Sequence, residues 1–249
     1  MFKKWSFLSF FSLFVAISLL FSTLSFSFFK NSMDLSTNTM PYEECVIVID
    51  AGHGGIDGGA TGTNGVTEKD LNLAVASKLA ALFRMTGYTV IETRTSDCSL
   101  ADTDAKKGHV KQSDLTNRLK ISNQYPKSVL ISIHMNTYPG VDCSGLQVWY
   151  SQNNDLSAEL ANAVQGGVKS MLQPQNNRKI KAATSSIYLL RHAENPAILI
   201  ECGFISNVEE CEKLTTEIYQ KELALAIFAS LHKKMQNDTC DNTKRMLYY

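Results

Sequence analysis

Downstream of residue 44, short continuous apolar segments alternate with longer segments in which apolar residues recur every three to four positions. The short segments are rich in β-branched residues, as buried parallel strands are. They predict strands at residues 45–50, 88–93, 129–134, 145–150, 187–190 and 197–201. The periodic segments predict helices at residues 68–85, from about 113 through 121, at 156–172 and at 217–235. This alternation favours a single α/β domain, with a mostly parallel twisted sheet and helices on both faces.

The first 30 residues have a different pattern. Lys3 and Lys4 precede an uncharged apolar run at residues 5–29, and Lys30 closes it. Such a run is long enough to span a bilayer and no small-residue cleavage motif follows it, so an uncleaved anchor is favoured over a cleaved signal peptide. The early lysines predict that the rest of the chain lies outside the membrane. We therefore expect four parts, namely a signal or transmembrane anchor at 1–30, a linker at 31–44, the folded domain at 45–236 and a polar tail at 237–249.

Charge and cysteine content exclude several classes of protein. The chain has 24 basic and 24 acidic residues, so its net charge gives no reason to expect nucleic-acid binding. Six cysteines are present without a Cys-x-x-Cys pair, which argues against a zinc ribbon or thioredoxin-like chemistry. A disulfide between Cys98 and Cys143 stays open, because an exported protein can form one. Cys45 and Cys202 lie in apolar runs and are expected to be buried thiols.

Two histidines follow predicted strands. His53 comes shortly after the first predicted strand, and His134 ends the third. In a parallel sheet the carboxyl ends of the strands meet at one edge, where sites form. Two imidazoles and one carboxylate, with an open fourth position, make a common catalytic zinc set. The glycine-rich segment after His53 offers three candidate carboxylates, Asp57, Glu68 and Asp70, and Glu68 begins a predicted helix, where it could instead be only a first-turn acid.

Glu201 closes the apolar strand segment Ala-Ile-Leu-Ile-Glu at the same predicted edge of the sheet. An ionisable side chain at that place costs desolvation free energy unless it is paired or functional. In a zinc hydrolase, a carboxylate separate from the ligands takes the proton of the attacking water and passes it to the leaving amine. Glu201 fits this role because it lies on a different strand from the candidate ligands. A structural salt bridge is the alternative, and these positions alone specify no substrate.

Five segments between about residues 46 and 235 carry a more specific signal. They read, in order, VIDAGHGGIDGGATG, TEKDLNLAVASKL, ISIHMN, SGLQVWY and NPAILIECGFISN. This series resembles the successive motifs of the zinc-dependent N-acetylmuramoyl-L-alanine amidases. Within that family, the chain is most similar to the germination-specific, spore-cortex type, which is tethered to a membrane.

The resemblance assigns roles residue by residue. It implies that His53, Glu68 and His134 hold Zn²⁺ and that Glu201 is the catalytic glutamate. It implies peptidoglycan as the substrate, cut at the amide between the lactyl group of N-acetylmuramic acid and L-alanine of the stem peptide. In the spore-cortex type this cut prepares muramic acid for conversion to its lactam. The implied location is outside the membrane, on the forespore or cortex side of a sporulating bacterium's membrane.

The resemblance also bears on regulation. Septum-splitting members carry an inserted helix that covers the zinc, whereas here only ten residues separate His134 from Gly145. The activity is therefore expected to be controlled by the timing of expression, by membrane tethering or by an activating partner protein. Two other functions stay open, a zinc peptidase that cuts within the stem peptide and a catalytically inactive wall-binding or scaffold protein. The roles of Arg94 and Arg118 stay open between substrate contact and structural ion pairs.

Overall fold

The computed structural model describes residues 45–139 and 143–247. The predicted anchor at 1–30 and the predicted linker at 31–44 lie outside the described residues. Within the two described ranges, no helix is both long enough and apolar enough to cross a membrane.

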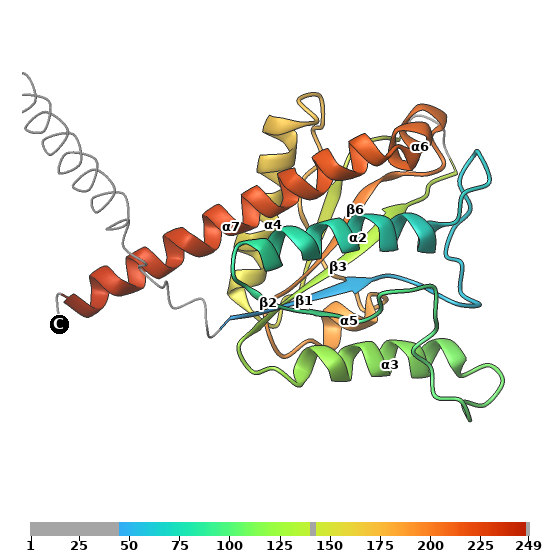
Figure 1. Ribbon diagram of the computed structural model, residues 1–249, viewed down its shortest axis with the longest axis horizontal. Helices are drawn as coiled ribbons and strands as arrows, with labels where there is room; N and C mark the ends of the chain where they lie inside the picture. Colours follow the sequence, from blue (N-terminus) through green and yellow to red (C-terminus); the bar gives the residue numbers. More distant parts are fainter. Residues whose placement is uncertain (1–44, 140–142, 248–249) are drawn as a thin grey trace, which may run out of the picture. The chain divides into compact units, whose positions relative to one another are not determined.

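A six-stranded sheet forms the centre of the domain (Figure 1). Its strands are β1 (Val46–Ala51), β2 (Thr89–Glu92), β3 (Ser128–Asn136), β4 (Gln147–Tyr150), β5 (Lys181–Ala182) and β6 (Ala197–Phe204), in the spatial order β2-β1-β3-β6-β4-β5. Strands β2, β1, β3 and β6 run parallel, whereas β4 is antiparallel to β6 and parallel to β5. The predicted α/β fold with a mostly parallel sheet is therefore confirmed.

Helices pack on both faces of the sheet, as predicted. They are α2 (Glu68–Met85), α3 (Val110–Asn123), α4 (Asp155–Met171), α5 (Tyr188–His192), α6 (Val208–Thr215) and α7 (Glu217–Leu247). One core lies between the sheet and α2, α4 and α7, and a smaller core lies on the opposite face, under α3 and α5 (Figure 1). Because side chains alternate along a strand, each face of the sheet has its own set of residues.

This alternation determines which side chains reach the edge of the sheet on the α3 side. In β3, Ile131 and Ile133 belong to the larger core, so Ser132 and His134 point to the other face. In β6, Ile200 and Cys202 belong to the larger core, so Glu201 shares the face of His134. The polar residues of neighbouring strands are thereby collected at the carboxyl end of the parallel strands.

The predicted strand at 187–190 is wrong, because these residues begin the short helix α5. A hydrogen bond from Arg191 N to the carbonyl of Ile187 marks the helical turn, at 3.0 Å, and Leu189 and Leu190 are buried beneath it. A four-residue apolar run has too few positions for its periodicity to separate strand from helix. The edge strand is instead β5, where Lys181 and Ala182 pair with β4.

Two helices differ from the prediction near the C-terminus. Helix α6 is not predicted by the apolar pattern, because only Cys211 and Leu214 provide its buried apolar side chains. Its first turn is instead capped by Asn207, whose side chain accepts a hydrogen bond from Glu210 N. Helix α7 continues to Leu247, beyond the predicted end near Met235. The apolar pattern marks only the part of α7 that packs on the core, which ends at Met235.

Cys98 and Cys143 are both free thiols, so the disulfide between them that was left open is not formed. Cys202 is buried in the larger core, as predicted, and burial holds the pKa of its thiol well above the usual value. Cys45 is only half-buried at the start of β1 and packs against the same core. Both thiols therefore contribute apolar contacts to the fold.

Candidate metal centre

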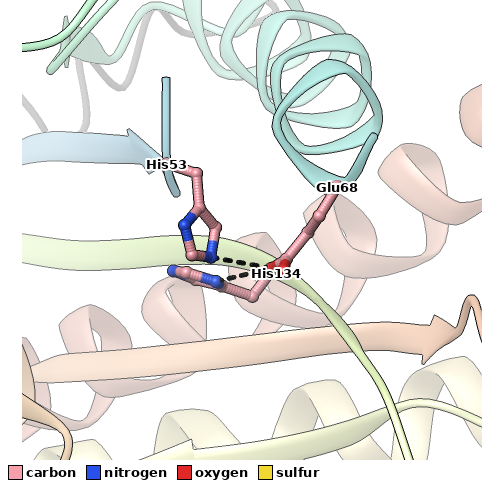
Figure 2. Close-up of side chains that lie close together, drawn as sticks. All are labelled: His53, Glu68 and His134. Carbon is pink, nitrogen blue, oxygen red and sulfur yellow. Dashed lines mark hydrogen bonds and ion pairs between the residues drawn. The ribbon is translucent and has the colours of Figure 1, made fainter. Parts of the chain in front are cut away.

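Three side chains from separate elements converge at the carboxyl edge of the sheet (Figure 2). His53 follows β1, Glu68 is the first residue of α2, and His134 lies in β3. Oε1 of Glu68 lies 3.2 Å from Nε2 of His53 and 2.9 Å from Nδ1 of His134. One potential ligand atom from each residue lies within 4.8 Å of the other two. The structure thus brings together the three residues that the sequence selects as metal ligands.

The Glu68 carboxylate is held from both sides. Ala60 N donates to its Oε2 at 3.0 Å, and Met135 N donates to its Oε1 at 3.2 Å. Burial alone would raise the pKa of Glu68, but the hydrogen bonds and charges of His134 and His53 outweigh it and hold the pKa far below its usual value. Glu68 is therefore ionised and held in place in the metal-free site, as a ligand for a metal cation must be.

Asp70, the second candidate carboxylate, does not belong to this cluster. Its side chain accepts a hydrogen bond from Thr67 Oγ1 at the start of α2 and is exposed. The first turn of α2 therefore presents two acids with different surroundings, Glu68 towards the histidines and Asp70 towards solvent.

Two glycines of the glycine-rich loop are required by the close approach of these side chains. A Cβ atom on Gly52 would lie 2.2 Å from Nε2 of His134. A Cβ atom on Gly59 would lie 2.5 Å from Oε2 of Glu68, and the φ of Gly59 is +65°. His53 itself has a φ of 61°, an uncommon conformation for a residue with a side chain. The backbone is thus shaped around the ligand side chains.

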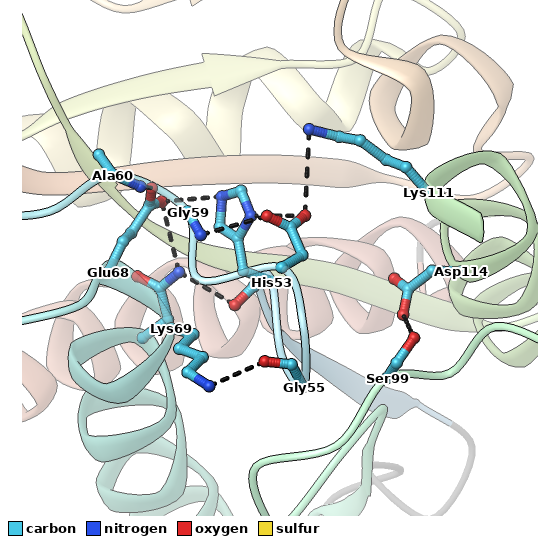
Figure 3. Close-up of polar contacts among 12 residues, drawn as sticks. His53, Gly55, Gly59, Ala60, Glu68, Lys69, Ser99, Lys111 and Asp114 are labelled. Atoms are coloured by element: carbon cyan, nitrogen blue, oxygen red, sulfur yellow. Dashed lines mark hydrogen bonds and ion pairs between the residues drawn. The ribbon is translucent and has the colours of Figure 1, made fainter. Parts of the chain in front are cut away.

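Asp57, the third candidate carboxylate, contacts His53 on the side away from Glu68 (Figure 3). Its Oδ2 lies 2.9 Å from Nδ1 of His53, while its Oδ1 accepts a hydrogen bond from Gly59 N at 3.2 Å. Burial alone would lower the pKa of His53, but Glu68 and Asp57 outweigh it and hold the pKa above its ordinary value. A carboxylate on the outer nitrogen of a metal-binding histidine fixes the orientation of the ring.

Arg118, from α3, binds the turn that leads to His53. Its guanidinium donates to the carbonyl of His53 at 2.6 Å, to the carbonyl of Ala51 at 2.7 Å and to Oδ1 of Asp50 at 2.7 Å, and it also contacts Asp114. Arg118 and Asp50 are both almost fully buried. These contacts use four of the five N–H donors of a guanidinium and give Arg118 a structural role.

Arg94, which follows β2, completes the support from the other side. It donates to the carbonyls of Ala51 and Gly52, both at 2.9 Å, and to the carbonyl of Lys69 in α2 at 2.8 Å. Arg94 therefore ties the loop of His53 to the helix of Glu68. Both arginines therefore make structural contacts, and no sequence pattern could have paired them with these backbone carbonyls.

We expect Asp50→Ala to destabilise the metal-free protein by about 3–5 kcal/mol, because it removes the more deeply buried of the two carboxylates that pair with the buried Arg118 guanidinium. Burial alone would raise the pKa of Asp50, but Arg118 and Ser132 outweigh it and lower the pKa, so this stabilisation is present at neutral pH and is lost as the pH falls through the folded-state pKa. Urea unfolding measures the change. Asp104→Ala, at an exposed loop position, is the matched control and should unfold like the wild type; equal stability of the two variants would contradict the assigned role of Asp50.

Glu201 is the neighbour of His134 on the adjacent strand. The two residues are paired in the register of β3 and β6, and Gln147 of β4 pairs with Glu201 on the other side. Oε2 of Glu201 is buried and has no hydrogen-bond partner among the described residues. Burial raises the pKa of Glu201 to about 7. A buried carboxyl group with an unpaired oxygen next to a ligand cluster is typical of a group that exchanges protons.

The donor set fits a metal ion. Two imidazoles and one carboxylate that already surround a common point match the three-ligand set of catalytic zinc, which keeps one position open. Gly52 and Gly59 lie so close to His134 and Glu68 that a side chain at either position would collide with these ligand candidates. Together with Glu201, the centre has the parts required for metal-assisted hydrolysis.

Comparisons with known proteins agree with this chemistry. Residues 47–233 match the family model described as N-acetylmuramoyl-L-alanine amidase. A germination-specific N-acetylmuramoyl-L-alanine amidase of Bacillus subtilis is 34% identical over 231 residues, which cover 92% of this chain and 94% of the relative. The solved structure of the CwlD amidase from Clostridioides difficile, in complex with the GerS lipoprotein, has a TM-score of 0.73 at 37% identity and covers 77% of this chain and 98% of that chain. The amidase AmiC2 of Nostoc punctiforme has a TM-score of 0.67 at 29% identity, over 78% of this chain and 98% of that chain.

Proposed function

The chain belongs to the N-acetylmuramoyl-L-alanine amidase family, and we propose that it is a zinc enzyme with His53, Glu68 and His134 as ligands and Glu201 as the catalytic residue. The observation that carries this proposal is the convergence of the three ligand side chains beside a buried glutamate oxygen that has no partner among the described residues. When bound there, Zn²⁺ would polarise the scissile carbonyl and lower the pKa of a water molecule towards about 7.

Glu201 moves the proton in this mechanism. Its carboxylate accepts a proton from the attacking water, and the resulting acid donates that proton to the nitrogen of L-alanine as the amide bond breaks. In the metal-free protein, burial raises the pKa of Glu201 to about 7, so the group can both accept and donate a proton near neutral pH. The structural salt bridge that the sequence left as an alternative has no support, since no ion pair involves Glu201 among the described residues.

The substrate of the proposed reaction is peptidoglycan, at the amide between N-acetylmuramic acid and L-alanine of the stem peptide. The similarity to a relative named as germination-specific supports a role in the spore cortex, where the cut would precede formation of muramic lactam. This role places the domain outside the membrane, and we propose that residues 1–30 anchor it there. A similar amidase forms a complex with a lipoprotein, which supports an activating or tethering partner for this chain as well.

A muropeptide digest tests metal, reaction and bond together. Residues 31–249 loaded with zinc should release stem peptides that begin with a free L-alanine amine and leave a free lactyl carboxylate on muramic acid, as read by mass spectrometry. A chelator should stop the release and added zinc should restore it. Fragments cut within the stem peptide would instead identify a zinc peptidase. Wall binding that survives chelation without any product would identify an inactive scaffold.

A further inference from the structure

Asn72 is a buried polar residue of α2 that the proposed mechanism does not use. It lies one helical turn after Glu68, and its side chain is fully buried. Its Nδ2 donates a hydrogen bond to the carbonyl of Gly52 at 3.1 Å and a longer one to Oε1 of Glu68 at 3.4 Å. One amide group therefore contacts both the glycine-rich loop and a ligand candidate.

The orientation of the Asn72 amide follows from its two partners. The carbonyl of Gly52 can only accept hydrogen bonds, and so can the ionised carboxylate of Glu68, so both must face the NH₂ group of Asn72. The opposite atom of the amide, Oδ1, is buried and has no hydrogen-bond partner among the described residues. A buried acceptor without a partner lowers the stability of a fold. Asn72 therefore supplies donors beside the metal centre at a cost in stability.

Gly52 connects Asn72 to both histidines of the cluster. It immediately precedes His53 in the chain. A Cβ atom on Gly52 would lie between 2.2 and 2.7 Å from three atoms of the His134 ring, so the backbone of Gly52 packs directly against that ring. A shift of Gly52 would therefore move the start of the His53 loop and also change the surface on which the His134 ring lies.

We propose that Asn72 is a positioning residue of the metal centre, which holds Glu68 in place relative to the two histidines by binding both Gly52 and Glu68 with one amide group. Residues that hydrogen-bond to metal ligands without touching the metal commonly raise its affinity by about 10- to 100-fold. This inference rests on the proposed zinc enzyme and adds to it a residue outside the ligand set. It predicts that Asn72 strengthens zinc binding while it lowers the stability of the metal-free protein.

The test measures zinc affinity and stability separately, in the full-length protein held in a mild detergent. Asn72→Leu keeps nearly the shape of the side chain and removes both the donors and the unpaired oxygen. The carbonyl of Gly52 keeps the donor of Arg94. The carboxylate of Glu68 keeps the donor of Met135, so no buried acceptor loses its last partner. In competition with a chromophoric chelator, the Kd of the variant for zinc should rise by about 10- to 100-fold. After chelator treatment, its unfolding midpoint in urea should be at or above that of the wild type.

Two further variants complete the comparison. Asn195→Leu is the matched control, because Asn195 is also buried but lies just before β6, where its Nδ2 donates to the carbonyl of Tyr125 at 3.0 Å. This control should lower the urea midpoint and leave the Kd for zinc unchanged, which is the opposite pattern. Asn72→Ala repeats the affinity measurement with a side chain too small to clash, and its Kd for zinc should also rise.

Wild-type zinc affinity in both Asn72 variants would overturn the positioning role. A rise in Kd no larger than the unfolded fraction of the metal-free variant accounts for would overturn it too, because a purely structural residue changes stability and affinity together. Either result leaves the zinc amidase proposal intact. A wild type that binds no zinc would instead overturn the proposed ligand set itself.

Discussion

Glu201→Gln should reduce turnover by about 100- to 10,000-fold while the protein keeps its full complement of metal. The glutamine side chain has nearly the same shape as glutamate but cannot accept the proton of the attacking water. It also leaves the three ligand side chains unchanged, since Glu201 hydrogen-bonds to none of them. Single-turnover assays with muropeptides measure the chemical step, and metal analysis of the same sample shows whether zinc is retained.

The same substitution has a second expected effect, on stability, that separates a catalytic role from a structural one. The pKa of Glu201 is about 7 in the metal-free folded protein and near 4.5 in an unfolded chain. Between pH 4.5 and pH 7, Glu201 is therefore mostly protonated in the folded state and mostly ionised in the unfolded state. Folding stability of the wild type therefore falls as the pH rises from about 4.5 to about 7, because the buried group must ionise. Glu201→Gln removes this cost, of about 1–3 kcal/mol above pH 7.

Urea unfolding of the chelator-treated proteins at pH 5 and pH 8 checks this expectation. The variant should gain stability over the wild type at pH 8 and little at pH 5, whereas Glu209→Gln, at an exposed position of α6, should show neither change nor loss of turnover. A Glu201→Gln protein that stays fully active would refute the assigned mechanism. One that is inactive but less stable than the wild type at pH 8 would point to a structural role.

The parts of the fold that follow from local pattern could be predicted from the sequence. Strands β1, β3 and β6 are buried on both faces of the sheet, so their sequences are continuous apolar runs rich in β-branched residues. Such runs are recognised as strands from the sequence alone. Helix α2 starts at Glu68 and ends at Met85, as its apolar spacing predicts. Helix α5 could not be predicted in this way, because its five residues are too few for a helical periodicity of apolar positions to be recognised.

The candidate site also has residues that local sequence patterns identify and residues that they do not. His53, His134 and Glu201 can be selected because each ends or follows an apolar run of the sequence, although β3 continues to Asn136 and β6 to Phe204. The order of the strands then brings the three residues together. The contacts of Arg118 could not be found in this way, since its partner carbonyl at His53 is 65 residues away and carries no side-chain signature. Sequence patterns reveal groups that do chemistry more readily than groups that hold a backbone in place.

Glu68→Gln should weaken zinc binding by at least about 100-fold and abolish turnover at limiting metal. Loss of a residue that only hydrogen-bonds to a metal ligand already lowers metal affinity by about 10- to 100-fold. Glu68→Gln removes the negative charge from a proposed ligand itself, so the loss of affinity should be at least as large. The amide oxygen can still accept from one of the two backbone donors, at Ala60 or Met135, while the other donor loses its acceptor, so we expect a local loss of stability rather than loss of the fold. Competition of the protein with a chromophoric zinc chelator measures the affinity. Asp70→Asn makes the same change of charge in the same helical turn, at an exposed position, and should bind zinc like the wild type.

The pH dependence of zinc binding distinguishes a direct effect of Glu68 from a general loss of structure. In the metal-free wild type, Glu68 and Asp57 outweigh burial and raise the pKa of His53, so zinc must displace a proton there, and affinity should fall as the pH drops through that raised value. Glu68→Gln removes one of the two acids that hold the proton on His53. The pH at which affinity falls should therefore move lower in the variant even though its affinity is weaker throughout. A variant with wild-type affinity would remove Glu68 from the ligand set, and an unchanged pH midpoint would show that Glu68 does not control the protonation of His53.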